Sequence, residues 1–229
     1  MADTSPAAAL SPGIPAETDV LIAGGGPTGV TLALLLARQG VRVLVAEKEA
    51  AIFPLPRAAH IDHETMRLLG DAGCAGQVMA GCRQTSRYDF LTADGRILLR
   101  FDGSDAIGPG GWPAANMIHQ PSVEAALRAR LAAEPSARLA TGTTLLDATD
   151  HGDHVQARLV SASGTHSVRA RYLVGADGAR SPVRTQAGIG FEDLGFEEPW
   201  LVVDLLVHDP SRLPAVNLQI CDPARPTTC

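Results

Sequence analysis

Short apolar runs and a helical stripe alternate in the first fifty residues of the chain. Val20 to Ala23 is a continuous apolar run, which is typical of a strand buried on both faces. After a set of glycines, Leu32, Leu35 and Leu36 give a helix an apolar face. Val41-Arg42-Val43-Leu44-Val45 is predicted to form a second strand. The pattern predicts a strand–helix–strand unit and therefore a parallel sheet.

The apolar pattern changes beyond residue 86. Residues 88–92 and 96–101 flank Ala93-Asp94-Gly95, which is typical of a β-hairpin. Such antiparallel strands do not continue a parallel sheet, so we expect them in a second layer. A helix is predicted over residues 62–69, a second helix with Ser122 as its N-cap, and a short third helix that begins at Ser181-Pro182. Further strands are predicted over residues 138–140, 143–149, 155–160, 166–171, 171–176, 200–207 and 215–220.

Composition and charge exclude several classes of protein. With 229 residues, an apolar share of 45% and a net charge of −6, the chain has no basic stripe for nucleic acid and no run that could cross a membrane. Residues 1–18 lack the pattern of a signal peptide, so we expect a disordered tail on a cytoplasmic protein. Cys74, Cys82, Cys221 and Cys229 lack metal-ligand spacing and are expected to be reduced thiols.

Candidate chemistry begins at Gly24-x-Gly26-x-x-Gly29, the spacing of a dinucleotide-binding turn. Gly24 permits the tight turn, Gly26 lets the backbone approach a pyrophosphate, and Gly29 allows close packing of helix on strand. A helix starting near Pro27 directs its N-terminus at the phosphates. Glu47 ends the second strand, where a carboxylate can accept hydrogen bonds from ribose hydroxyls. The alternative is a strand–helix–strand unit that binds nothing, with Glu47 merely solvated.

Two further positions can be interpreted either as part of a binding site or as ordinary surface and turn residues. Arg57 follows the first unit in a proline-rich loop, where a guanidinium could clamp a phosphate or simply lie on the surface. Asp177-Gly178 follows a short apolar strand, at the edge where open α/β sheets bind ligands. The same dipeptide is also common in ordinary turns. His60 and Asp62 are expected to be structural.

Several motifs occur in one order that resembles a known family. They are the Gly24–Gly29 turn, Glu47, Pro56-Arg57-Ala58, His119-Gln120-Pro121 and Gly175-Ala176-Asp177-Gly178. The order is similar to that of the class A flavoprotein monooxygenases, which have the para-hydroxybenzoate hydroxylase fold. Several stretches are more similar still to the bacterial 3-(3-hydroxyphenyl)propionate hydroxylases. They are Pro56-Arg57-Ala58 through Ile61-Asp62, Gly111-Trp112-Pro113, Trp200-Leu201-Val202-Val203-Asp204 and Cys221-Asp222-Pro223-Ala224-Arg225-Pro226.

The resemblance implies an FAD-dependent hydroxylase of a phenolic acid that uses NAD(P)H and O2. It implies an α/β protein, with a Rossmann-like FAD-binding domain and part of an antiparallel substrate-domain sheet. The implied cofactor-binding residues are Gly24, Gly26, Pro27, Thr28, Gly29, Glu47, Lys48, Arg57, Gln120, Asp177 and Gly178. No catalytic residue and no metal site is assigned, because the flavin itself carries the chemistry. Oligomers are possible; nucleic acid and membrane partners are not expected.

The resemblance also divides the chain. Residues 19–85 and 112–190 would form the FAD-binding domain, while residues 86–111 and 191–229 would form part of the substrate domain. Members of the family have a third flavin motif, a Gly-Asp-Ala-like segment, which this sequence lacks. The chain is therefore expected to be a truncated or partial hydroxylase.

Three other functions stay open on the sequence. A polyketide or antibiotic hydroxylase would use the same flavin residues. A non-catalytic FAD- or nucleotide-binding fragment is compatible with the missing motif. A nicotinamide-binding reductase is disfavoured by the Asp177-Gly178 segment and by the antiparallel strands.

Overall fold

The computed structural model describes residues 13–205, 207–209, 211 and 213–229. The chain forms two compact units. Unit 1 ends its first part at Phe53 and resumes over Leu127–Glu192; unit 2 comprises Pro54–Ala126 and Asp193–Cys229. These limits differ from those of the predicted cofactor and substrate domains, and that functional division stays a prediction.

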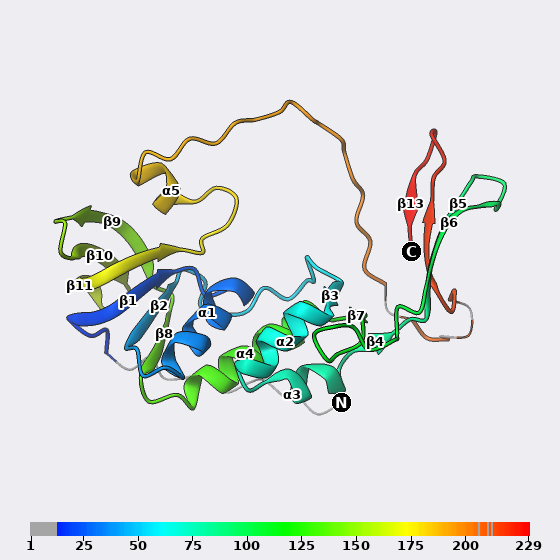
Figure 1. The fold of residues 1–229 in the computed structure, drawn as a ribbon. Coiled ribbons are helices and arrows are strands. Elements are labelled where there is room, and N and C mark those ends of the chain that lie inside the picture. The colour runs from blue at the N-terminus through cyan, green and yellow to red at the C-terminus, as the bar shows by residue number, and fades with distance from the viewer. Residues whose placement is uncertain (1–12, 206, 210, 212) are drawn as a thin grey trace. The chain divides into compact units, whose positions relative to one another are not determined.

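Unit 1 is built on a six-stranded sheet (Figure 1). In spatial order its strands are β8 (Ala137–Thr141), β2 (Val43–Glu47), β1 (Glu17–Ala23), β11 (Gly164–Gly175), β10 (Val155–Ser161) and β9 (Thr144–Asp150). β8, β2, β1 and the end of β11 are parallel, and helix α1 (Pro27–Ala37) packs against β1, β2 and β8. The predicted parallel sheet is confirmed, and Val20 to Ala23 lie near the centre of the six strands.

The strand β11 belongs to two patterns at once. Its first part pairs antiparallel with β10, ending at Ala170 opposite Val155. Its last part pairs parallel with β1, with Tyr172 opposite Val20 and Gly175 opposite Ala23. The predicted meander is confirmed, but the separate strands expected over residues 166–171 and 171–176 are a single strand. No glycine, proline or asparagine lies between these two segments, so nothing in the sequence ends the first strand before the second begins.

The core of unit 1 lies on the faces of this sheet. Its fully buried side chains include Leu21, Ile22, Val30, Leu34, Leu44, Val45, Leu159 and Val168. The continuous apolar runs of β1 and β2 follow from this burial on both faces. Thr18 is also buried, and its hydroxyl donates to the Arg42 carbonyl at 2.9 Å. Because β1 begins at Glu17, the last two residues of the expected disordered tail are ordered strand; residues 1–12 lie outside the described part of the chain.

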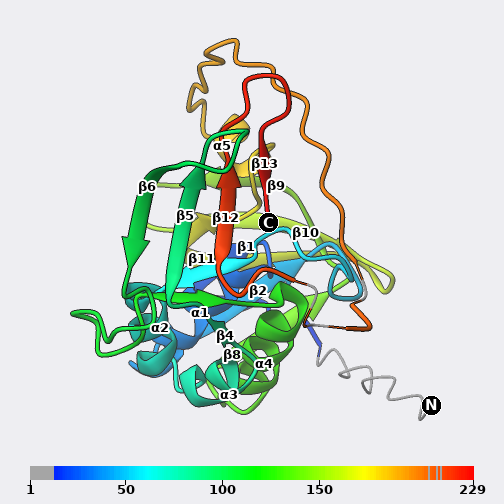
Figure 2. The same ribbon diagram turned by 90° about the vertical axis from the view of Figure 1, so that its right-hand side faces the viewer.

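Unit 2 contains two small sheets and the helices α2 (His63–Asp71), α3 (Ala75–Ala80) and the start of α4 (Gln120–Ala132). One sheet has the order β3 (His60–Asp62), β7 (Ala115–Met117) and β4 (Arg83–Gln84). The other has the order β13 (Thr227–Thr228), β12 (Asn217–Ile220), β5 (Arg87–Leu91) and β6 (Ile97–Asp102) (Figure 2). The predicted hairpin is β5–β6, and it is antiparallel. β12, expected in an antiparallel layer, instead pairs parallel with β5.

Two local predictions are wrong. The described residues of the segment 200–207 form no strand, and Trp200 and Leu201 are 65% and 88% exposed. An apolar run becomes a strand only where another strand pairs with its backbone, and the described residues supply no such strand here. Ser122 does not cap α4, because this helix begins at Gln120. At α2, by contrast, the Asp62 carboxylate caps the helix and accepts from the Thr65 amide at 2.8 Å.

No helix in the described ranges is both long and apolar enough to cross a membrane.

An ion pair at the start of the sheet predicts a pH dependence of stability. The Arg42 guanidinium donates to both Asp19 oxygens, at 2.8 and 3.0 Å, and these bonds hold the pKa of Asp19 at about 2. The ordinary pKa of an aspartate is about 3.9, so the ion pair stabilises the fold fully above that pH. Its contribution is lost as the pH falls from about 4 through 2. We expect Asp19→Asn to be less stable than wild type at pH 6, with the difference shrinking towards pH 2. Urea unfolding at several pH values measures this, and a difference independent of pH would contradict it.

Candidate cofactor-binding site

The glycine turn joins β1 to α1 through backbone contacts that leave no room for side chains. Gly24 has a φ of +106°, and a Cβ on it would lie 2.2 Å from the Ala176 carbonyl oxygen. A Cβ on Gly29 would lie 2.0 Å from the Gly24 carbonyl oxygen. Gly26 differs, because a Cβ there would meet nothing within 4 Å. Gly24 and Gly29 are therefore needed for packing, whereas Gly26 faces open space at the N-terminus of α1.

Glu47 is buried beneath the turn. One carboxylate oxygen accepts from the Gly25 amide at 2.6 Å, and the other accepts from the Glu49 amide at 2.8 Å. A Cβ on Gly25 would lie only 2.7 Å from the Glu47 Cβ, so this glycine too is required by close packing. Each carboxylate oxygen has a second lone pair, so Glu47 keeps acceptor capacity for a ribose hydroxyl. That role stays a prediction.

Arg128 contacts the glycine turn, and the sequence did not reveal this contact. It lies on α4 within unit 1, and its guanidinium donates to the Gly25 carbonyl at 3.0 Å. In the sequence, Arg128 is only a charged residue next to Leu127, on a helix that buries Leu127 and Leu131 in the core. An arginine at such a position is equally compatible with a surface role, in which its aliphatic stem covers apolar side chains and its guanidinium lies in water.

Asp177 and Gly178 lie beside the glycine turn at the end of β11. A Cβ on Gly24 would be 3.0 Å from the Asp177 amide nitrogen. Asp177 Oδ2 accepts from the Val183 amide at 3.0 Å and so fixes the start of α5 (Pro182–Gln186). Oδ1 is buried and has no hydrogen-bond partner among the described residues. A buried carboxylate oxygen needs a donor, and a hydroxyl group of a dinucleotide would fit. Gly178 has a φ of +83°, which explains the glycine.

Arg57 and Gln120 come together in unit 2. Gln120 Oε1 accepts from the Arg57 amide at 3.1 Å and from the Ala58 amide at 2.7 Å. Its Nε2 donates to the buried Glu124 carboxylate at 2.8 Å, which fixes the orientation of the amide. Gln120 therefore holds the backbone of the Arg57 loop, while the Arg57 side chain is exposed. The sequence did not single out Glu124.

The remaining predicted residues flank the turn. Pro27 is the first residue of α1, where its missing N–H and fixed φ suit the helix start. Thr28 is exposed in the first turn of that helix. Lys48 follows Glu47, but its side chain is 73% exposed and its Nζ lies 3.8 Å from Glu49. Contacts of these residues with a cofactor stay predictions.

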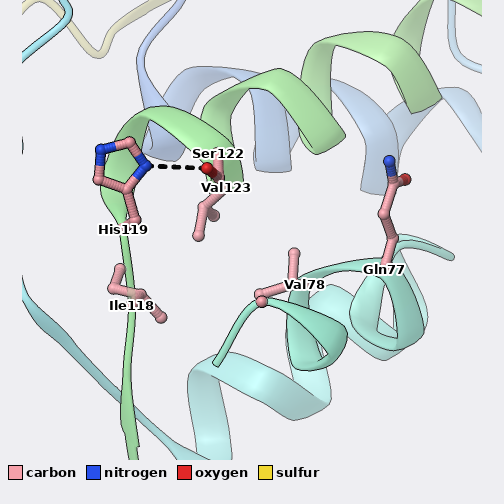
Figure 3. Close-up of a pocket in the computed structure, with 7 residues that line it drawn as sticks. Gln77, Val78, Ile118, His119, Ser122 and Val123 are labelled. Carbon is pink, nitrogen blue, oxygen red and sulfur yellow. Dashed lines mark hydrogen bonds between the residues drawn. The ribbon is translucent and has the colours of Figure 1, made fainter. Parts of the chain in front are cut away.

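A small hollow in unit 2 is not this site. It has a volume of about 30 Å³ (Figure 3). Its lining comes from α3 and the residue after it, and from the start of α4 and the two residues before it: Gln77, Val78, Gly81, Ile118, His119, Ser122 and Val123. Such a volume holds about one water molecule. None of the predicted site residues lines it.

The glycine turn, the buried acid at the end of β2 and the orphaned oxygen of Asp177 together fit a dinucleotide cofactor. Residues 17–221 match the family model described as FAD binding domain. The chain belongs to the FAD binding domain family. The resemblance based on the order of motifs is thereby confirmed, and FAD is the cofactor of this domain.

Named relatives of this FAD binding domain are hydroxylases. The chain is 41% identical over 212 residues to a probable NADH-specific resorcinol 4-hydroxylase from Rhodococcus jostii (strain RHA1). It is 36% identical over 211 residues to a 3-(3-hydroxy-phenyl)propionate/3-hydroxycinnamic acid hydroxylase from Mycobacterium sp. (strain JLS). These matches cover 91% and 92% of this chain, which spans 39% and 36% of the length of the relatives.

Solved structures similar to this FAD binding domain are flavin-type hydroxylases and monooxygenases. Para-nitrophenol 4-monooxygenase from Pseudomonas putida DLL-E4 is similar with a TM-score of 0.70 and 25% identity, over 75% of this chain and 44% of that one. Aklavinone-11 hydroxylase in complex with FAD and aklavinone is similar with a TM-score of 0.65 and 36% identity, over 77% of this chain and 36% of that one.

Because Gly24 and Gly26 have different surroundings, we expect an alanine to lower the stability of the fold at Gly24 and to affect mainly FAD binding at Gly26. Gly24→Ala should cost at least about 2 kcal/mol of unfolding free energy, because it adds a clash at a positive φ. Gly26→Ala should change it by less than about 0.5 kcal/mol, since Gly26 is extended and open. Gly26→Ala should nevertheless weaken FAD binding, because the methyl group fills the open side of the turn. Urea unfolding and flavin titration measure the two effects; equal stability of both variants would contradict the assignment.

Proposed function

We propose that the protein containing this FAD binding domain is a monooxygenase that hydroxylates a phenolic aromatic compound with reduced nicotinamide and O2. The observation that carries the proposal is the match to two phenol hydroxylases over more than nine-tenths of this chain. It is supported by a glycine turn whose one open position lies at the N-terminus of an eleven-residue helix.

Each part of the site would have its own task toward FAD. The Gly26 amide and the N-terminus of α1 would receive the pyrophosphate, because both offer N–H groups to an anion. Glu47 would accept a hydrogen bond from the adenosine ribose. Asp177 Oδ1 would accept one from a cofactor hydroxyl near the pyrophosphate. Arg57 and Gln120 are proposed to contribute on the flavin side.

When bound, FAD supplies the redox chemistry, by accepting hydride and activating oxygen for transfer to an electron-rich ring. The described residues bind and orient it. Gln120, fixed by Glu124, holds the Arg57 loop. Glu47 holds Gly25 of the turn, and Asp177 holds the start of α5 beside it. A set of binding groups without a side-chain nucleophile suits a reaction in which the cofactor carries the reactive atoms.

We propose NADH as the source of electrons, because the resorcinol hydroxylase among the relatives is named NADH-specific. An assay of NADH against NADPH oxidation tests this directly. The cytoplasmic location and the oligomeric state stay predictions.

A polycyclic substrate is the second candidate. The structure of aklavinone-11 hydroxylase is 36% identical over the aligned part, which equals the identity to the hydroxyphenylpropionate hydroxylase. An enzyme of this kind would hydroxylate a fused-ring aromatic in place of a simple phenol.

The experiment is to purify the protein, titrate it with FAD, and follow NADH oxidation with each kind of substrate. We expect FAD to bind, and resorcinol or 3-(3-hydroxyphenyl)propionate to stimulate NADH oxidation with formation of a product carrying one more oxygen. Hydroxylation of aklavinone alone would favour the second candidate. Failure to bind FAD, or NADH oxidation with no hydroxylated product from any of these substrates, would contradict the proposal.

The buried acid gives a sharper test of the cofactor site. Glu47→Ala should weaken FAD binding by roughly 1–3 kcal/mol, because a cofactor hydroxyl and the Gly25 amide would both lose a charged acceptor. Glu49→Ala is the matched control, since this neighbouring carboxylate is 66% exposed. Flavin titration of both variants measures the difference, and equal affinities would remove Glu47 from the site.

A further inference from the structure

The three successive glycines of the turn do not by themselves determine its backbone conformation. Gly24, Gly25 and Gly26 are three glycines in succession, and glycine has the widest choice of backbone angles. A peptide group between two glycines can rotate at little steric cost. A turn that must present N–H groups to an anion therefore needs something to fix its peptide planes.

Two side chains fix the peptide groups on either side of Gly25. Glu47 accepts from the Gly25 amide at 2.6 Å, and this fixes the Gly24–Gly25 peptide. Arg128 donates to the Gly25 carbonyl at 3.0 Å, and this fixes the Gly25–Gly26 peptide. Both bonds include a charged group, so each is stronger than a bond between neutral groups.

The planarity of the peptide converts the Arg128 bond into an orientation of Gly26. In a trans peptide the C=O and the following N–H point in opposite directions. Because the Gly25 carbonyl points to Arg128, the Gly26 N–H points away from it. A rotation of this peptide would exchange the two directions and aim a carbonyl oxygen, instead of an N–H, at an incoming phosphate.

We propose that Arg128 is a positioning residue for FAD, which acts through the Gly25–Gly26 peptide and forms, with Glu47, a clamp on Gly25 that sets the turn before the cofactor binds. The expected change in FAD affinity rests on the proposed function. The clamp itself is a property of the protein without cofactor and can be measured separately.

The test compares Arg128→Met, which keeps most of the stem and removes the donor, with Arg138→Met. Arg138 is the matched control, because it too donates from a guanidinium to a backbone carbonyl in unit 1, that of Gly13 at 3.1 Å. We expect Arg128→Met to weaken FAD binding about tenfold, as the loss of one charged hydrogen bond implies. Arg138→Met should leave it unchanged. Arg128→Lys, which keeps a charged donor, should restore part of the affinity.

Two readouts separate positioning from a general loss of stability. In the cofactor-free protein, amide hydrogen exchange at residues 24–26 should be faster in Arg128→Met than in Arg138→Met, while exchange in β1 stays the same. The effects of Arg128→Met and Glu47→Gln on FAD affinity should be non-additive, since both act on one glycine; those of Arg138→Met and Glu47→Gln should add.

The outcomes distinguish this inference from the proposed function. Equal FAD affinities of the two methionine variants, or unchanged exchange at residues 24–26, would overturn the role of Arg128 and leave the hydroxylase proposal intact. Failure of wild type to bind FAD would overturn the proposed function, while the exchange experiment still decides whether the clamp exists. If Arg128→Met does not fold, Arg128→Lys is compared with Arg138→Lys by the same measurements.

Discussion

Contact between backbones at the glycine turn is the constraint on which unit 1 depends. Gly24 lies against the carbonyl of Ala176, and Gly29 lies against the carbonyl of Gly24, both too closely for any side chain. These two approaches join the start of α1 to the ends of β1 and β11. The position of the helix N-terminus is thus set by the same contacts that place two strands at the centre of the sheet. The turn therefore folds in this way only in the absence of a Cβ at Gly24 and Gly29.

The sequence predicted the parts of unit 1 that follow from local patterns. Strands of a buried parallel sheet are rich in apolar residues, so Val20 to Ala23 and the strand that contains Val43, Leu44 and Val45 were recognisable. The glycine spacing identified the turn between strand and helix. The hairpin around Gly95 was equally clear, because its turn residues and alternating strands agree. Among the predicted site residues, those that belong to a motif could be named from the sequence, and their contacts with a cofactor stay predictions. Glu47 was found at the end of its strand, although its bonds to two backbone amides were not foreseen.

Features that depend on distant partners were not predictable. Residues 200–207 have the composition of a strand, yet whether a strand forms depends on another segment to pair with. The parallel pairing of β12 with β5 is likewise decided far from its own sequence. Arg128 and Glu124 resemble ordinary helical residues until the fold shows what they hold, which is Gly25 in one case and Gln120 in the other. A residue that acts on a backbone carbonyl or on another side chain leaves no spacing signature.

Because β11 pairs with β10 along its first part and with β1 along its last part, the two parts differ in how well they tolerate an insertion. Gly175, which lies beside the glycine turn, and the turn at residues 161–164 are at opposite ends of one twelve-residue strand, roughly 35 Å apart for extended chain. The hairpin half is held by β10 alone, so an insertion in that turn lengthens the hairpin without shifting the register of Tyr172 with Val20. This turn is therefore a suitable place to fuse a reporter peptide or an affinity tag. An insertion there would leave the end of β11 beside the glycine turn undisturbed.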